Sequence, residues 1–225
     1  MKDKYIITID GPAGAGKTTI ARTVARRLGF KYVDTGAMYR AVTLGVIEAS
    51  VEFDSVPEIE ELAGKMDIRI DFEDGKMLIF LNGREVSDDI RGSQVTENTS
   101  LVAAIPGVRY KLARLQRSSA GKLGRTVFEG RDMGSIVFPG ADLKVYLDAG
   151  ISERARRRWQ ELKDKGIDVD FGSLEEKIKR RDMLDESRGL APLRVPKNAV
   201  IIDSTNLSIE DVVQQIVSLA YRDKP

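Results

Sequence analysis

The stretch YIITIDGPAGAGKTT, residues Tyr5–Thr19, decides the fold of this 225-residue chain. It begins with a short apolar, β-rich run, which is typical of a buried parallel strand. Residues 11–18 then match G-x-x-x-x-G-K-[ST], the Walker A pattern, and the residues up to Gly29 carry apolar side chains at helical spacing. A strand, a glycine-rich loop and a helix in this order predict a phosphate-binding loop, or P-loop.

Phosphate binding follows from the chemistry of these residues. The glycines allow backbone N–H groups to surround an anion, and the helix N-terminus adds its partial positive charge. Lys17 supplies a full positive charge for the β- and γ-phosphates of a nucleotide, and the Thr18 hydroxyl can ligate Mg²⁺. The alternative is a tight turn with a solvent-exposed lysine, which the flanking strand and helix disfavour.

The composition excludes several classes of protein. Hydrophobic residues make up 42% of the chain, enough for a sizeable core, and 36 Lys and Arg balance 35 Asp and Glu. A bulk electrostatic attraction to nucleic acid or to a membrane surface is therefore not expected. No apolar run approaches the roughly 20 residues that span a bilayer, and the N-terminal apolar run is too short for a signal peptide. We expect a cytoplasmic protein that binds neither nucleic acid nor membranes.

The chain contains no cysteine and no histidine. Disulfides, cysteine-ligated metals, thiol and histidine triads, and histidine general bases are therefore excluded. The residues that remain for catalysis are carboxylates, lysine, arginine and hydroxyls, together with an added ion. Phosphoryl transfer suits this set, because it depends mainly on positioning and on neutralising charge.

Four more short β-rich runs follow the first strand, at residues 31–35, 125–130, 143–148 and 199–204. Helical patterns separate most of them, which predicts an α/β fold: a P-loop NTPase core with a five-stranded parallel sheet flanked by helices. Ligands of such sheets bind at the carboxyl ends of the strands. Those ends carry acidic residues, namely Asp10, Asp34, Glu129, Asp148 and Asp203, although each alone could be a cap or a loop residue.

One segment breaks the alternation of strands and helices. DIRIDFEDGKMLIFLNGREVSDD, residues 67–89, contains two β-patterned runs, each followed by a glycine-containing turn. It predicts a small three-stranded antiparallel insertion over residues 66–97, within a single domain of residues 1–225. We expect this insertion to form an independent flap.

Clusters of arginine and aspartate indicate the substrate side of the site. DTGAMYR (34–40) and EGRDMGSIVFP (129–139) each follow a predicted strand, and RDMLDESRG (181–189) spaces its charges along one predicted helix face. In RARRRW (154–159), Arg154, Arg157 and Arg158 are likewise expected on one helix face. Salt-bridged surface helices are the alternative, but two phosphorylated ligands would require several arginines.

The chain resembles the bacterial cytidylate kinases, nucleoside monophosphate kinases with a P-loop core. The resemblance runs from Ile7 to about Ser208. The matching segments are ITIDGPAGAGK, DTGAMYR, VAAIPGVR, GRDMGSIVFPGADLKVYLDA, ERARRR, RD at 181–182, APL and DST. GRDMG…VFP and the antiparallel insertion are its specific parts. It implies transfer of the ATP γ-phosphoryl group to CMP or dCMP with Mg²⁺, by a monomer.

The resemblance also assigns roles to residues. ATP would be held by Gly11, Pro12, Ala13, Gly14, Ala15, Gly16, Lys17, Thr18 and Thr19, with Arg157 and Arg158 in a mobile lid at about 151–172, and Thr18 as a metal ligand. The acceptor nucleotide would contact Asp34, Thr35, Arg40, Ser100, Arg109, Arg131, Asp132, Arg181, Asp185 and Arg188. Catalysis would rest on Lys17, Arg131, Asp132 and Arg181. Many members of the family carry Asp where this chain has Glu129.

Recognition of cytosine has a physical reason within this assignment. Ser100, Arg109 and Arg188 would contact the base, and cytosine presents hydrogen-bond acceptors at O2 and N3, whereas a guanidinium offers only donors. Uracil carries an N3–H, which would face another donor and remain unpaired. The insertion is expected to move on CMP binding more than on ATP binding.

Three other functions fit parts of the sequence. Another small-molecule P-loop kinase, such as an adenylate or shikimate kinase, would have a different acceptor pocket and no insertion of this kind. A GTP-dependent switch protein would carry an N-K-x-D guanine signature, which is absent. A P-loop ATPase acting on nucleic acid would show a hydrophobic run ending in Asp-Glu and a basic surface.

Overall fold

The computed structural model describes residues 3–164 and 166–222, so residues 1, 2, 165 and 223–225 of the predicted domain lie outside it. Two separate sheets organise the described chain. Five parallel strands lie in the order β2-β6-β1-β7-β8, and three antiparallel strands lie in the order β3-β4-β5. The parallel strands are β1 (Tyr5–Asp10), β2 (Lys31–Asp34), β6 (Arg125–Gly130), β7 (Leu143–Asp148) and β8 (Val200–Asp203). The predicted fold class is confirmed, and every predicted parallel strand lies within one residue of its expected bounds.

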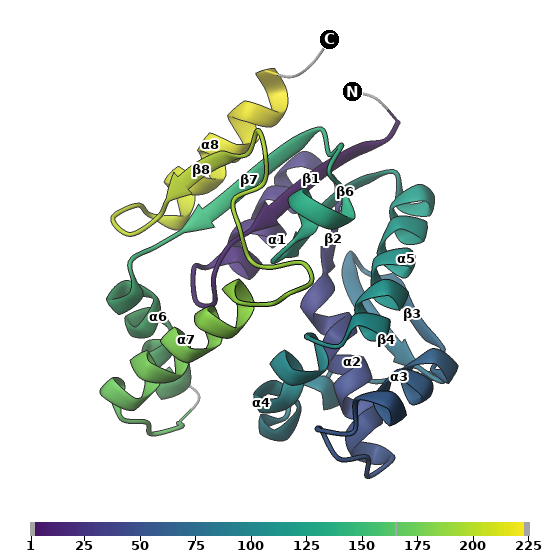
Figure 1. Ribbon diagram of the computed structural model, residues 1–225. Coiled ribbons are helices and arrows are strands. Elements are labelled where there is room, and N and C mark those ends of the chain that lie inside the picture. Colours follow the sequence, from purple (N-terminus) through teal and green to yellow (C-terminus); the bar gives the residue numbers. More distant parts are fainter. Residues whose placement is uncertain (1–2, 165, 223–225) are drawn as a thin grey trace.

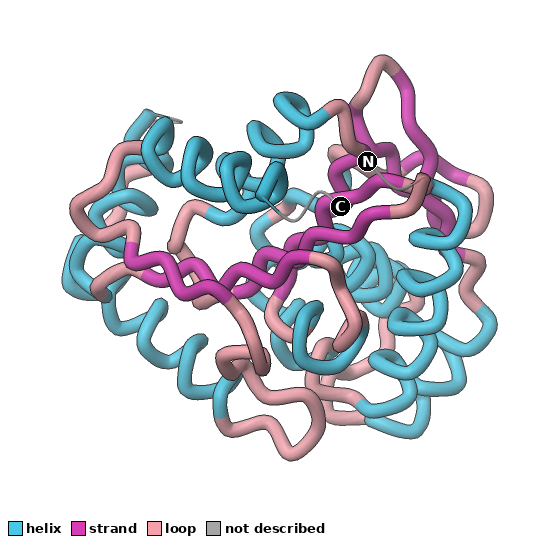
Figure 2. Tube along the Cα trace, turned by 90° about the horizontal axis from the view of Figure 1, so that it is seen from above, coloured by secondary structure: helices cyan, strands magenta, loops and turns pink. Residues whose placement is uncertain are grey.

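Helices cover both faces of the parallel sheet (Figure 2). The described helices are α1 (Lys17–Leu28), α2 (Thr35–Glu48), α3 (Val56–Lys65), α4 (Ser93–Val102), α5 (Pro106–Leu123), α6 (Ile151–Asp164), α7 (Phe171–Glu186) and α8 (Ile209–Arg222), with short turns η1 (Asp89–Arg91) and η2 (Met133–Val137). Of these, α1, α2, α5 and α8 pack on the parallel sheet. Figure 1 shows α6 and α7 as one block and α2 to α4 with β3 and β4 as another. None of the helices described combines the length and the apolar character that a membrane crossing requires.

The central strand β1 is buried along its whole length because it contributes to two cores. Ile7 and Ile9 pack with α1 and α8 on one face, whereas Ile6 packs with α2 and α5 on the other. Side chains of a strand alternate between its faces, so a continuous apolar run is what a strand covered by helices on both sides requires.

The P-loop leaves β1 beside the backbone of β7. Gly11 adopts φ +150°, and a Cβ there would lie 2.0 Å from the carbonyl oxygen of Leu147. Only glycine fits this approach. At the other end of the loop, Gly16 caps α1 in the left-handed conformation and provides no capping side chain. The first N–H groups of α1 are therefore left for a ligand.

The antiparallel insertion consists of β3 (Ile68–Glu73), β4 (Lys76–Leu81) and β5 (Arg84–Glu85). Turns at Asp74–Gly75 and Asn82–Gly83 join them, with positive φ at all four residues. The rest of the predicted range 66–97 after β5 holds η1 and the first half of α4 rather than strand.

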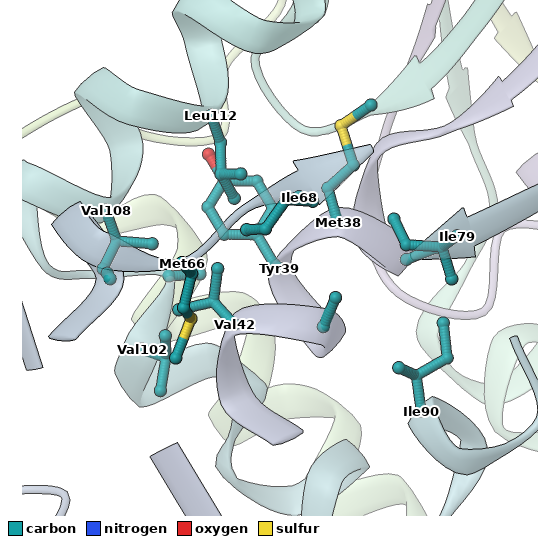
Figure 3. Packing of buried hydrophobic residues seen from close by; sticks show 14 of the residues in the cluster. Met38, Tyr39, Val42, Met66, Ile68, Ile79, Ile90, Val102, Val108 and Leu112 are labelled. Carbon is teal, nitrogen blue, oxygen red and sulfur yellow. The ribbon is translucent and has the colours of Figure 1, made fainter. Parts of the chain in front are cut away.

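The insertion shares its core with the neighbouring helices. Ile68 and Ile79 of the insertion belong to the same buried cluster as Met38 and Val42 of α2 and Leu112 of α5 (Figure 3). The expected independent flap is thus packed against α2, and a motion of the insertion would carry α2 with it.

Candidate active site

The P-loop lysine is buried between the loop and the acceptor side of the site. Lys17 is 5% exposed, and its Nζ donates to the carbonyl oxygen of Pro12 at 2.6 Å. Burial, and then the charge of Arg131, lowers the pKa of Lys17, while Glu129 opposes this effect. The ammonium group is therefore poised beside groups of both signs, where a bound phosphate would favour its charged form.

A carboxylate at the end of β6 binds two hydroxyl groups beside this lysine. Thr18 Oγ1 donates to Glu129 Oε1 at 2.8 Å, and the Tyr32 hydroxyl donates to Glu129 Oε2 at 2.5 Å. Burial, and then the charge of Asp34, raises the pKa of the Glu129 carboxyl. Glu129 is absent from the predicted site residues, although it was recognised as a strand-end carboxylate. Tyr32 gave no sequence signal beyond its place in a strand.

These oxygens fit a divalent cation. The Thr18 hydroxyl and the Glu129 carboxylate are hard ligands of the kind that Mg²⁺ prefers. Within the described residues, no group of three or more His, Cys, Asp or Glu side chains could hold a metal alone. Mg²⁺ typically binds one or two protein oxygens together with substrate phosphates, so the residues present suit an ion that arrives with a nucleotide.

Arginines converge on the opposite wall. Arg131 Nε donates to Asp185 Oδ2 at 3.0 Å, and Arg40 pairs with Asp34 at 2.7 Å. Arg181 has no ion-pair partner in the described part of the chain, and its buried Nε has no hydrogen-bond acceptor there. Burial, followed by the charge of Arg131, lowers the pKa of Arg181 to about 10. Such a cluster of cations is an anion site, because a phosphate would relieve its mutual repulsion.

Two further arginines form buried pairs toward α4 and α5. Arg109 donates to Asp132 Oδ2 at 2.5 Å and to the carbonyl oxygen of Ala103 at 2.8 Å. Arg188 pairs with Asp185, and burial lowers its pKa to about 10. Arg188 was expected on one helix face with Asp185, but α7 ends at Glu186, so Arg188 lies in the following loop. The expected proximity holds although the helical reason for it was wrong.

The lid arginines take different directions. Arg157 donates to the carbonyl oxygen of Ser204 at 2.6 Å, and Arg158 pairs with Glu161 at 2.7 Å. Arg154 was expected on the same face, but it is only 8% exposed and turns beneath the P-loop. Residue 165 of the predicted lid, about 151–172, lies outside the described residues.

One cavity of about 970 Å³ connects most of these groups, although Tyr32 and Arg154 do not line it. A volume of this size is large for a ligand pocket and suits two bound molecules. Apart from Gly11 and Pro12, all predicted site residues line it: Ala13, Gly14, Ala15, Gly16, Lys17, Thr18, Thr19, Asp34, Thr35, Arg40, Ser100, Arg109, Arg131, Asp132, Arg157, Arg158, Arg181, Asp185 and Arg188.

The cavity also has lining residues that were missed. Tyr39 lies under the Arg109 guanidinium, 5.5 Å from the ring centroid to Cζ, and belongs to the DTGAMYR segment. Ser204, which belongs to the DST segment, lines it beyond β8 together with Leu207 and Ser208. Arg91, Thr96 and Thr99 line it from η1 and α4. No motif indicated this last group, because only the packing of α4 places it there.

Comparison with known proteins gives a consistent result. A family model described as Cytidylate kinase matches residues 7–222. A protein named Cytidylate kinase from Caldicellulosiruptor saccharolyticus is 45% identical over 219 residues, covering 97% of this chain and 96% of that protein. Another of that name, from Pasteurella multocida, is 43% identical over 218 residues, covering 97% and 96%. Among solved structures, TT1252 from Thermus thermophilus matches at TM-score 0.52 and 17% identity, over 99% of this chain and 98% of that chain, a likeness of fold alone.

Proposed function

This chain belongs to the cytidylate kinase family, and we propose that it transfers the γ-phosphoryl group of ATP to CMP or dCMP, releasing ADP and CDP or dCDP. The observation that carries the proposal is the cavity that joins the P-loop to Arg181, which has no ion-pair partner among residues 3–164 and 166–222. The donor's phosphates and the acceptor's phosphate would both enter it, from opposite walls.

The chemistry requires little covalent work from the protein. A phosphate oxygen of CMP is already an anionic nucleophile, so no general base is needed, which agrees with the absence of histidine. Lys17, Arg131 and Arg181 would surround the transferring group and neutralise its charge. When bound beside Thr18 and Glu129, Mg²⁺ would supply further positive charge at the donor's phosphates.

The remaining residues would hold the acceptor nucleotide. Arg40 would share its phosphate with Arg131 and Arg181. Asp132 and Asp185 fix arginines through ion pairs and would lie near the sugar. Ser100, Arg109 and Arg188 would donate to cytosine, and a uracil N3–H would oppose such donors.

We also propose that the enzyme is a cytoplasmic monomer that requires Mg²⁺. ATP-dependent transfer needs a compartment that holds ATP. Light scattering after gel filtration should give the mass of one chain, 24.9 kDa, and a dimer mass would contradict this part of the proposal. Activity that persists in excess EDTA would contradict the requirement for the ion.

A coupled assay of ADP release tests the function directly. The purified chain with Mg²⁺ and ATP would be offered CMP, dCMP, UMP, AMP and shikimate in parallel. CMP and dCMP should give the highest kcat/KM, UMP a lower value, and AMP and shikimate turnover near background. A preference for AMP or shikimate would refute the acceptor assignment, and no ADP release with any acceptor would refute the kinase assignment.

A further inference from the structure

The backbone N–H and the backbone carbonyl of one P-loop residue are both held by side chains from α6 and α7. The N–H of Ala13 donates to Asp182 Oδ1 on α7 at 3.2 Å. The carbonyl oxygen of Ala13 accepts from Arg154 Nη1 on α6 at 3.0 Å. Arg154 and Asp182 form an ion pair with each other, which closes a ring of three contacts around Ala13.

This ring lies out of solvent. Arg154 and Asp182 are each 8% exposed, and Arg154 Nε also donates to the carbonyl oxygen of Ala149 at 2.8 Å. A buried ion pair contributes little net stability, because desolvation offsets the attraction between the charges. Stability therefore does not explain why the Arg154–Asp182 pair forms hydrogen bonds with the backbone of Ala13 in the P-loop.

Helix α6 also packs directly against the P-loop. Gly14 adopts φ +78°, and a Cβ there would lie 3.1 Å from the Cβ and 3.1 Å from the carbonyl oxygen of Arg154. In the described part of the chain, no protein group accepts a hydrogen bond from the N–H of Gly14, Ala15 or Gly16. The loop thus turns the N–H of Ala13 outward to Asp182, while the next three N–H groups are left for an anion.

We propose that Arg154 and Asp182 are positioning residues that hold the P-loop in its phosphate-binding shape. Neither side chain needs to touch ATP, since each acts through the backbone of Ala13. The proposal rests on the proposed function, because it assumes that the loop binds the donor's phosphates. It also gives α7 two tasks, since this helix carries Arg181 toward the acceptor and Asp182 toward the P-loop.

A double variant, Arg154→Met with Asp182→Leu, separates positioning from stability. It removes both charges together and keeps apolar volume, so it should fold with a Tm close to that of the wild type. It leaves both polar groups of Ala13 without their partners. Calorimetric titration with Mg²⁺ and ATP should show Kd raised by about tenfold or more, which corresponds to the loss of one or two hydrogen bonds. The Kd for CMP alone should change by less than about twofold.

Two variants and one further measurement sharpen the test. Asp182→Asn keeps an oxygen for the N–H of Ala13 and should raise the Kd for ATP less than the double variant does. Arg180→Met, on the exposed face of α7, is the matched control and should leave both Kd values unchanged. Hydrogen exchange of the peptide containing Ala13 should be faster in the double variant only, because its N–H has lost its acceptor.

A double variant that binds ATP with the wild-type Kd would overturn the proposal. Equal weakening of ATP and CMP binding, or failure of the double variant to fold, would assign the pair to general stability and overturn it as well. These results differ from a failure of the proposed function, in which the wild-type chain itself would not bind ATP.

Discussion

The two arginines assigned to the cytosine base should differ in how strongly the fold depends on them. The side chains of Arg109 and Asp132 are 5% and 4% exposed, and Arg109 is the ion-pair partner of Asp132 in the described chain. Asp185, the partner of Arg188, keeps a second arginine, because Arg131 Nε also donates to it at 3.0 Å. Arg109→Met should therefore leave the buried Asp132 carboxylate without a charged partner, whereas Arg188→Met should leave Asp185 paired with Arg131.

The magnitudes follow from these partners. Removing one member of a buried ion pair costs about 3–5 kcal/mol, because an uncompensated charge stays behind. For a chain of this size, each 1 kcal/mol shifts Tm by about 2–4 °C, so Arg109→Met should lower Tm by roughly 6–20 °C. Arg188→Met loses a charged hydrogen bond worth about 1.5–3 kcal/mol, and the relief of its repulsion from Arg109 offsets part of that loss.

Urea unfolding and steady-state kinetics measure the two effects separately. Both variants should lower kcat/KM for CMP by about 10- to 100-fold and change the KM for ATP little. UMP should lose less than CMP, because the removed donor is mismatched to its N3–H. A double variant, Arg109→Met with Asp132→Leu, should recover much of the lost stability without recovering the activity with CMP.

Two results would refute this reasoning. If Arg109→Met lowers the free energy of unfolding no more than Arg188→Met, the Asp132 carboxylate does not depend on Arg109. If CMP and UMP lose kcat/KM equally in both variants, the arginines hold phosphate or structure, and base recognition has to be assigned elsewhere.

Three further predictions concern the P-loop, the strand β1 and the insertion. Lys17→Met should lower kcat by orders of magnitude while leaving Tm nearly unchanged, since one charge at the transferring group is lost; near-normal turnover of the folded variant would contradict the P-loop mechanism. Burial raises the pKa of Asp10 to about 6, above its unfolded value of 3.8, so its contribution to stability is full below pH 3.8 and is lost as pH rises through 6. The stability of the wild type minus that of Asp10→Asn should therefore fall by about 2 kcal/mol between pH 4 and pH 7, and a constant difference in urea unfolding would disprove the shift. Hydrogen exchange across residues 68–85 should slow with CMP more than with ATP, and protection that CMP leaves unchanged would make the insertion a passive part of the core.

The sequence predicted the strands well for a physical reason. Strands β1, β6 and β7 are buried over most of their length, so β-rich runs between turn residues mark them, and this signal is local. The edge strand β8 is mostly exposed but carries the same kind of local β-rich run. The insertion was also predictable, since Asp74–Gly75 and Asn82–Gly83 supply the positive φ that tight turns need. The strand order β2-β6-β1-β7-β8 was not predicted, because no local pattern records which strands pair.

The sequence predicted correctly where most site residues lie, but it did not predict which residues they pair with. Residues of one motif leave one strand together, so Asp34 and Arg40, or Arg131 and Asp132, had to lie near the same sheet edge. Helical spacing then gave the wrong reason for Arg188, since the helix stops before it. Spacing also grouped Arg154 with the lid arginines, whereas its contacts with Ala13 and Asp182 depend on how α6 and α7 dock on the P-loop.

Charge pairing explains why these partners matter for function. The chain as a whole is nearly neutral, with 36 Lys and Arg against 35 Asp and Glu, and this balance hides the local arrangement. Arg109, Arg154 and Arg188 each meet a carboxylate, so their charges are largely neutralised before any ligand arrives. Arg181 has no such partner among the described residues, and burial, followed by the charge of Arg131, lowers the pKa of both Arg181 and Lys17. Among the buried arginines of the cavity, Arg181 thus keeps an uncompensated positive charge where the phosphates of donor and acceptor would meet, which is where a phosphoryl transfer needs it.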